Sequence, residues 1–336
     1  MAEPIMLEVT EIEALALRAL LRAGASPLQA GSLSRAIATA EAEGLASHGL
    51  GYLATYCEHL RCGKVIGTAV PKVAQPAPGV VVVDAGNGFA HAAIDAGFER
   101  LLPVVRVQGI AQLAIRNSYN CGVLGYHTER LATNGLVVLG FTNAPASIAP
   151  TGAMKPVLGT NPWSLAVPDG NGGVAFAIDQ SASVIAKSEV IKRSRTGESI
   201  PLDWALGPDG QPTTDPQVGL KGTMVPAGGY KGVGSALLVE VMAACLSGAT
   251  LGINASPFSG PVGGPPSTGQ GFIAIDPTIS SGDTFADRIS SLATAFAVEH
   301  GVRLPGAKRR ATRNRTAKSG VAVDAVLHAN VAALAE

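Results

Sequence analysis

The chain has 336 residues, of which 47% are hydrophobic and 15% are charged. These proportions exclude a disordered chain and predict a substantial core, while the length exceeds the usual size of one domain. Basic and acidic side chains number 25 each, so no net charge would attract nucleic acid or an anionic membrane.

The N-terminal part of the chain has the patterns of helices. Thr10 and Glu13 form a capping-box pattern ahead of an apolar run, which predicts that the first helix begins here. Ser26 and Pro27 predict the start of a second helix, because proline is favoured at the first helical position. A third helix is expected over residues 50–60.

The rest of the chain alternates between apolar strands, helices and loops. Residues typical of buried strands occupy 79–84, 111–115, 136–141, 174–179 and 272–275. Helical patterns occupy 90–102, 125–134, 232–246 and 283–301. Loop-rich stretches cover 161–173, 192–223 and 256–271, and residues 308–318 form a basic tail. This mixture predicts the α/β class without fixing the strand order.

The usual nucleotide-binding fingerprints are missing. Gly232-Val233-Gly234 lacks the third glycine of a Rossmann motif, because residue 237 is Leu, and no phosphate-binding P-loop is present. Residues 228–232, with Lys231, precede an apolar helix and would suit an anion at the helix start. A tight turn with a surface lysine explains the same residues equally well, so both interpretations stay open.

Neither a metal site nor a targeting segment is indicated. The cysteines form no Cys-x-x-Cys pair. Five of the six histidines show no metal-ligand spacing: His59, His91, His127, His300 and His328. The N-terminus lacks a basic region followed by an apolar run, and apolar stretches end before they reach membrane-spanning length. We therefore expect a cytoplasmic protein without a metal, a nucleic-acid partner or a membrane partner.

Short motifs follow one another along the chain, at residues 46–50, 117–122, 149–152, 158–162, 178–181, 212–216 and 228–232. Through them the sequence resembles the malate/L-lactate dehydrogenase family of the second type. That family includes sulfolactate and ureidoglycolate dehydrogenases, diketogulonate reductases and reductases of cyclic 2-imino acids. The set of motifs is specific for the family and not for one substrate.

The resemblance implies an α/β fold unlike Rossmann's, with a mixed-sheet cofactor domain and a helical domain built from both termini. We expect an N-terminal helical and substrate-binding region over 1–118 and an NAD(P)-binding domain over 119–284. Residues 285–336 would form a C-terminal helix and a basic tail that returns to the first region. The resemblance also implies a homodimer that uses NADP or NAD, and the basic tail favours NADPH.

His48 is the expected acid/base residue. Reduction of a C=O or C=N carbon needs a proton on the heteroatom, and histidine titrates near neutral pH. A lone histidine is more often structural; the resemblance is what favours catalysis. It also implies that Ser47 orients the His48 imidazole and that Asp179 holds the histidine or contacts the cofactor, although Ser47 could equally cap a helix and Asp179 could close an exposed turn.

The resemblance places a further set of residues against the dinucleotide. They are Asn120, Cys121, Gly122, Val123, Leu124, Thr160, Gln180, Ser181, Lys187, Ser188, Tyr230, Lys231, Lys308, Arg309 and Arg310. Residue 120 is often His in the family and residue 187 is often Arg. The guanidinium groups of Arg309 and Arg310 would suit a 2′-phosphate, although a solvated basic tail accounts for the same charges.

Substrate recognition departs from the family pattern at Tyr52. Many family members carry Arg at this position, four residues after the histidine, where it binds the substrate carboxylate. Tyr52 and Arg116 are therefore the expected substrate-binding residues, with Lys155 as another cation. The expected reaction is hydride transfer between nicotinamide and a small 2-hydroxy or 2-oxo acid of the malate, lactate or sulfolactate type. Reduction of cyclic 2-imino acids is the alternative, and a non-catalytic nucleotide sensor is a third interpretation.

Overall fold

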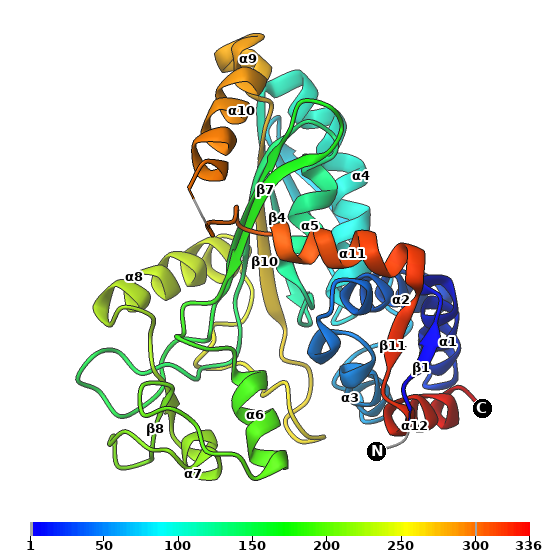
Figure 1. Cartoon of the computed structure of the whole chain (residues 1–336), viewed down its shortest axis with the longest axis vertical. Coiled ribbons are helices and arrows are strands. Elements are labelled where there is room, and N and C mark those ends of the chain that lie inside the picture. The colour runs from blue at the N-terminus through cyan, green and yellow to red at the C-terminus, as the bar shows by residue number, and fades with distance from the viewer. Residues whose placement is uncertain (1–2, 300) are drawn as a thin grey trace.

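A computed structural model describes residues 3–299 and 301–336, so that His300 lies outside the described part of the chain. Helices from both ends of the chain gather beside a long twisted sheet, and a smaller lobe with α6 and α7 lies below it (Figure 1). The α/β class and the helical unit built from both termini are confirmed. Within the described residues, none of the helices combines the length and apolarity needed to cross a bilayer.

Seven strands form the central sheet, in the order β2-β3-β4-β10-β5-β6-β7. Strands β3 and β4 are parallel and the other neighbours are antiparallel, which confirms a mixed sheet. The sheet crosses the expected boundary at residue 118, because β2, β3 and β4 belong to it. The strands are β2 (Lys72–Ala77), β3 (Val80–Asp84), β4 (Ile110–Ser118), β10 (Thr268–Ile275), β5 (Val137–Thr142), β6 (Trp163–Pro168) and β7 (Val174–Gln180).

Helices cover both faces of this sheet. On one face α4 (Ala90–Gln108) and α5 (Leu124–Ala132) pack against alternate strand residues such as Phe272. On the other face α8 (Tyr230–Val239) continues as the π-helix η2 (Glu240–Cys245), which packs on Ile273. Successive strand side chains point to opposite faces, so the sheet is buried on both sides here.

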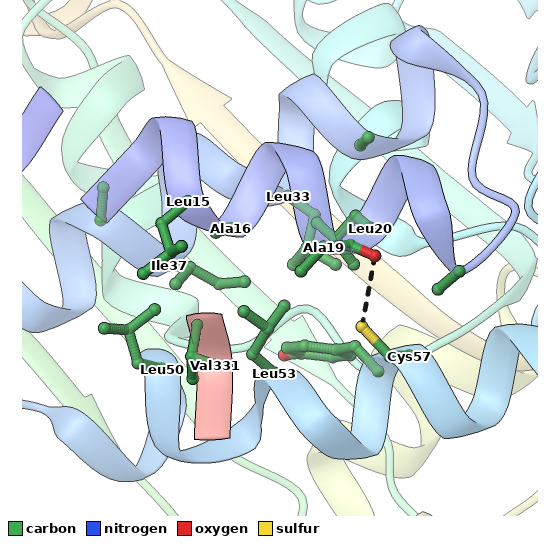
Figure 2. Packing of buried hydrophobic residues seen from close by; sticks show 14 of the residues in the cluster. Leu15, Ala16, Ala19, Leu20, Leu33, Ile37, Leu50, Leu53, Cys57 and Val331 are labelled. Carbon is green, nitrogen blue, oxygen red and sulfur yellow. Dashed lines mark hydrogen bonds between the residues drawn. The ribbon is translucent and has the colours of Figure 1, made fainter. Parts of the chain in front are cut away.

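The helical unit joins the two ends of the chain. Helices α1 (Val9–Arg22), α2 (Pro27–Ala42), α3 (Leu50–Arg61) and α12 (Ala325–Ala335) share one apolar cluster, and β1 (Ile5–Leu7) pairs with β11 (Val321–Val323). Figure 2 shows Leu15, Leu33, Leu53 and Val331 meeting in this cluster. Cys57 lies there too, and its thiol donates to the Ala19 carbonyl oxygen at 3.6 Å.

Several expected boundaries were wrong. Helix α1 begins after Glu8, which forms the capping box with Glu11, two residues before the predicted pair. Strand β6 lies in the predicted loop 161–173. The loop-rich stretch 192–223 contains the second half of α6, the whole of β8 and α7, and the first residue of β9. These elements are α6 (Lys187–Thr196), β8 (Ala205–Leu206), α7 (Pro216–Lys221) and β9 (Thr223–Met224).

The basic tail is the largest correction. Residues 308–318 lie in helix α11 (Ala307–Ser319), which runs from the edge of the sheet to the helical unit (Figure 1). Helices α9 (Pro277–Ser281) and α10 (Thr284–Ala297) precede it, and β11 and α12 follow it. The C-terminal region therefore contains several ordered elements, which are held by contacts with residues distant in sequence.

Candidate active site

A cavity of about 950 Å³ opens where the helical unit, the sheet and α11 meet. It has the size range of small-molecule and cofactor sites. Many of the expected residues line it: His48, Gly122, Val123, Leu124, Thr160, Asp179, Gln180, Ser181, Lys187, Ser188, Lys308 and Arg309. The structure thus brings together residues that lie up to 261 positions apart, counted from 48 to 309.

His48 ends a short 3₁₀-helix, residues Ala46–His48, which leads into α3. The imidazole is half-buried in the cavity wall. Its Nδ1 atom lies 3.0 Å from the hydroxyl oxygen of Ser47, a hydrogen-bond distance. Because the Ser47 hydroxyl engages Nδ1, the other ring nitrogen is left for exchange of a proton with a bound molecule.

Glu41, which sequence reasoning missed, fixes the backbone beside His48. Its buried carboxylate accepts a hydrogen bond from the Leu50 backbone N–H at 2.7 Å and so caps the start of α3. A side-chain carbon at Gly49 would overlap this carboxylate. Gly49 is therefore needed to admit Glu41, and not only to leave room for a substrate. Burial raises the pKa of Glu41, which the Leu50 hydrogen bond partly offsets.

Two opposing effects set the proton affinity of His48. Burial lowers its pKa below the ordinary value, because an imidazolium is poorly solvated in the wall, and the negative charge of Asp179 acts in the opposite direction. Asp179 stands near the end of β7 with its side chain 18% exposed. The site therefore pairs a histidine whose pKa is lowered by burial with a carboxylate that favours its protonated form.

Asp179 is held from two sides. Its Oδ2 atom accepts from the Gly125 backbone N–H at 2.8 Å and from Nη1 of Arg309 at 3.2 Å. Arg309 also contacts Glu129 at 2.8 Å. Arg309 is thus an ion-pair partner of cavity carboxylates, which leaves Lys187, Lys308 and Arg303 as further cations of the cavity lining. Arg303 was missed by sequence reasoning.

The lining suits a phosphate-bearing cofactor. Helix α6 begins in the cavity wall at Lys187 and Ser188, and its N-cap, Ala186, offers no side-chain cap to the free backbone N–H groups. Such a helix start, with a lysine beside it, attracts phosphate. Lys308 adds a second cation to the same cavity. The residues present therefore fit the expected dinucleotide.

Other expected cofactor residues do not line the cavity. Asn120 accepts a hydrogen bond from the Tyr56 hydroxyl at 3.2 Å, and the Cys121 carbonyl oxygen lies 2.9 Å from Nε2 of His127. Both residues belong to the loop between β4 and α5, which reaches the cavity at Gly122. Tyr230 and Lys231 are exposed at the start of α8, and Arg310 donates to the Ala175 carbonyl oxygen at 2.9 Å.

The expected substrate residues are likewise engaged elsewhere. The Tyr52 hydroxyl donates to the Phe258 carbonyl oxygen at 2.7 Å and so ties α3 to the loop that precedes β10. Arg116 forms an ion pair with Asp84 at 3.2 Å, and Lys155 is exposed. The cavity lining includes none of Tyr52, Arg116 and Lys155.

Tyr52→Phe separates a role in the fold from a role in binding. Loss of the hydrogen bond to Phe258 should lower the free energy of unfolding by about 0.5–1.5 kcal/mol. The KM for an acid substrate should change little, because the hydroxyl is committed to a backbone carbonyl. Chemical denaturation and steady-state kinetics measure the two effects. A large rise in KM with unchanged stability would show instead that the hydroxyl binds substrate.

Apart from Val123, Leu124, Pro162 and Ile178, the apolar part of the lining had no sequence signal. The remainder comprises Leu45, Ala177, Ala186, Leu304 and Pro305, together with two glycines, Gly301 and Gly306. Side chains of this kind carry no chemistry that a motif would reveal, and several belong to the segment between α10 and α11. Only their positions in the fold identify them.

Comparison with known proteins gives a consistent set of relatives. The model of the malate/L-lactate dehydrogenase family matches residues 7–332. A (2R)-3-sulfolactate dehydrogenase (NADP(+)) of Chromohalobacter salexigens is 42% identical over 314 residues, 94% of this chain and 93% of that protein. A Δ1-pyrroline-2-carboxylate reductase of Ancylobacter novellus is 37% identical over 99% of this chain and 98% of its own length.

One solved structure is closely similar to this chain in fold. The Δ1-piperideine-2-carboxylate reductase of Pseudomonas syringae pv. tomato superposes with a TM-score of 0.93 at 32% sequence identity. The superposition covers 98% of this chain and 99% of that one. The two chains therefore share their fold over essentially the full length.

Proposed function

This chain belongs to the malate/L-lactate dehydrogenase family, and we propose that it is an NAD(P)H-dependent reductase of a small 2-oxo acid, acting reversibly on the 2-hydroxy acid. The observation that carries this proposal is the position of His48. Its imidazole lies in the wall of the cavity that also holds Asp179, an uncapped helix start and the cations Lys187, Arg303 and Lys308. This arrangement provides a proton donor, a charge that stabilises its protonated form and a place for phosphates.

The proposed proton path uses three residues of this chain. His48 gives its proton to the heteroatom of the bound substrate and recovers it in the reverse direction. Ser47, at 3.0 Å from Nδ1, orients the ring, and Asp179 favours the imidazolium. A bound nicotinamide dinucleotide would supply the hydride. Residues Gly122, Val123 and Leu124 and the start of α6 would hold it, and the cation Lys308 supports NADPH.

The relatives support two substrate classes. In one class the reduced carbon is bonded to oxygen, and in the other it is bonded to nitrogen. The Chromohalobacter salexigens protein supports a 2-oxo acid such as sulfopyruvate, reduced to the 2-hydroxy acid. The Ancylobacter novellus and Pseudomonas syringae proteins support the alternative, a cyclic 2-imino acid. In this chain Tyr52 stands where many family members bind a carboxylate with Arg, so the acid group is expected to meet another cation of the cavity.

An assay of NADPH oxidation decides between these classes. Sulfopyruvate, oxaloacetate, pyruvate, Δ1-pyrroline-2-carboxylate and Δ1-piperideine-2-carboxylate are supplied in turn, with NADPH and then with NADH. Rapid turnover of a 2-oxo acid supports the proposal. Turnover of the imines alone replaces it with the alternative. Binding of NADPH with no turnover on the whole panel would favour a nucleotide sensor.

The direction of the His48 pKa shift predicts how the rate depends on pH. Reduction needs protonated His48, so kcat/KM for reduction should fall as pH rises through a midpoint below the ordinary value of about 6.5. Asp179→Asn removes the charge that raises this pKa, so the midpoint should move to lower pH. Asp203→Asn, at an exposed site, is the matched control. A midpoint that stays fixed in the Asp179 variant contradicts the assigned electrostatic role.

The proposal includes a homodimer in the cytoplasm. Exposed apolar side chains on α8 and η2 support a second copy as partner: Leu237, Leu238 and Val241 are 52%, 53% and 46% exposed. Helix α10 likewise has no buried residue. Neighbouring apolar side chains that are exposed on one helix are common at protein–protein contacts. Sedimentation velocity of the wild-type chain and of a Leu237→Glu variant measures this directly.

A further inference from the structure

Arg309 occupies the point at which three elements of the active site meet. Each nitrogen of its guanidinium faces a different carboxylate: Nη1 lies 3.2 Å from Asp179, Nη2 2.8 Å from Glu129 and Nε 3.8 Å from Glu43. The side chain is only 15% exposed, and those of Glu129 and Glu43 are 6% and 3% exposed. A planar guanidinium can serve three acceptors at once, which the compact ammonium of lysine cannot do with the same geometry.

The three carboxylates come from the three parts of the site. Glu43 is the C-cap of α2 and precedes His48 by five residues, through a short connection. Glu129 lies on α5, whose first residue and preceding loop line the cavity. Asp179 lies on β7 and itself lines the cavity. Arg309 therefore links the histidine segment, the cofactor loop and the sheet.

Two further contacts keep α11 in place. Arg313 lies 2.9 Å from Glu43 and 3.7 Å from Glu129, and the buried hydroxyl of Thr316 donates to the Ala42 carbonyl oxygen at 2.8 Å. Arg309 and Arg313 together face the three carboxylates, so each carboxylate has at least one arginine of this chain as its ion-pair partner. The charges of Glu43, Glu129 and Asp179 outweigh burial and hold the pKa of Arg309 above its ordinary value.

The local backbone is built to admit this arrangement. Gly125 donates its N–H to Asp179, and a side-chain carbon at this position would lie 2.6 Å from Nη2 of Arg309 and 2.8 Å from Oδ2 of Asp179. Any larger residue would require the end of the Arg309 or the Asp179 side chain to shift. The close approach of α5 to Arg309 is thus a second feature, independent of charge, that fixes the same junction.

We propose that Arg309 is a positioning residue: it holds His48, the cofactor loop and Asp179 in register through Glu43, Glu129 and Asp179, and it does not bind the cofactor phosphate. This inference rests on the proposed function, since it assigns a part in the same reaction. Because all three nitrogens face protein carboxylates, recognition of a 2′-phosphate falls to other cations of the cavity lining such as Lys308.

The discriminating measurement is the ratio of kcat/KM for NADPH to that for NADH in Arg309→Met. A positioning role predicts that kcat falls about 100-fold with both cofactors and that the ratio stays the same, since a misplacement of about 1 Å costs this much. A phosphate ligand would lower the rate with NADPH alone and so overturn the proposal. Lys308→Met should change the ratio, and Arg315→Met is the matched control, exposed on the same helix.

Two more variants keep the test valid if Arg309→Met does not fold. Arg309→Lys keeps the charge but loses the three-way contact, so it should fold and show kcat about tenfold below wild type, again with an unchanged ratio. Gly125→Ala should lower kcat in the same manner without removing a charge. Wild-type kcat in the lysine variant would contradict the proposal.

Cofactor binding distinguishes failure of this inference from failure of the proposed function. Binding of NADPH and NADH is followed by nicotinamide fluorescence in wild type and in the Arg309 variants, whether or not an acid is turned over. Equal changes in the two dissociation constants support positioning. Selective loss of NADPH binding overturns it, even if a substrate for the wild-type chain has not been found.

Discussion

His48→Ala should lower kcat/KM by roughly two to four orders of magnitude, with NADPH binding little changed. The imidazole lies in the cavity wall, 3.0 Å from the Ser47 hydroxyl, and it is the group there that gains and loses a proton near neutral pH. Without it, the heteroatom of the substrate must take its proton from water. Steady-state kinetics and a fluorescence titration with NADPH measure the two quantities.

The matched control for this change is His328→Ala. His328 lies on α12 and is not part of the cavity lining, and alanine is well tolerated in a helix. It should retain wild-type kinetics. Equal activity in the His48 and His328 variants would refute the acid/base role of His48. A loss confined to NADPH binding would instead make His48 a cofactor contact.

Asn161→Ala should lower the free energy of unfolding by about 3–5 kcal/mol, because it leaves buried polar groups without hydrogen-bond partners. The fully buried amide accepts from the Ala144 N–H at 3.1 Å and donates to the Ala236 carbonyl oxygen at 2.9 Å. It also donates to the buried carboxylate of Glu240 at 2.7 Å. The backbone of Asn161 has φ of 37°, a conformation that alanine tolerates poorly.

Chemical denaturation of this variant is compared with that of Asn171→Ala. Asn171 is exposed in the turn between β6 and β7, so its replacement should change stability by no more than about 0.5 kcal/mol. If the two variants were equally stable, the buried network around Glu240 would contribute little. The expected difference would show that the motif at residues 158–162 serves the fold as well as the cavity, to which Thr160 contributes.

Local signals predicted the elements that carry their own start and stop residues. Ser26 caps α2 and Pro27 occupies its first position, as expected, and α3 covers the predicted residues to within one position. Strand β6 was missed because Asn161 and Pro162 before it, and a glycine-rich turn after it, have the composition of a loop. Pairing with β5 and β7 outweighs that local composition.

Helix α11 could not be predicted from its own residues. Lys308, Arg309 and Arg310 have the composition of a solvated tail. The segment has almost no apolar face that would identify it as a helix. The partners that order it are carboxylates such as Glu43 and Glu129, which are 266 and 180 positions away from Arg309. Ion pairs between residues so distant in sequence leave no periodic signal.

Most of the polar lining was accessible from motifs, whereas most of the apolar lining was not. His48 was chosen because its chemistry and the family resemblance agree, and it lines the cavity. Glu41 was missed, since nothing local indicates that its carboxylate caps α3 nine residues later. Tyr52 was recognised as a departure from the family, but its bond to Phe258 depends on a loop more than 200 positions away.

Transfer of deuterium tests the central claim most directly. NADPH carrying deuterium at the transferable C4 position is incubated with the wild-type chain and the acid that the assay panel selects, and the product is analysed by mass spectrometry. We predict that the product carries deuterium on carbon 2 and that the His48→Ala variant forms it far more slowly. A product without deuterium, or NADPH consumption without this product, would contradict a direct hydride transfer in this cavity.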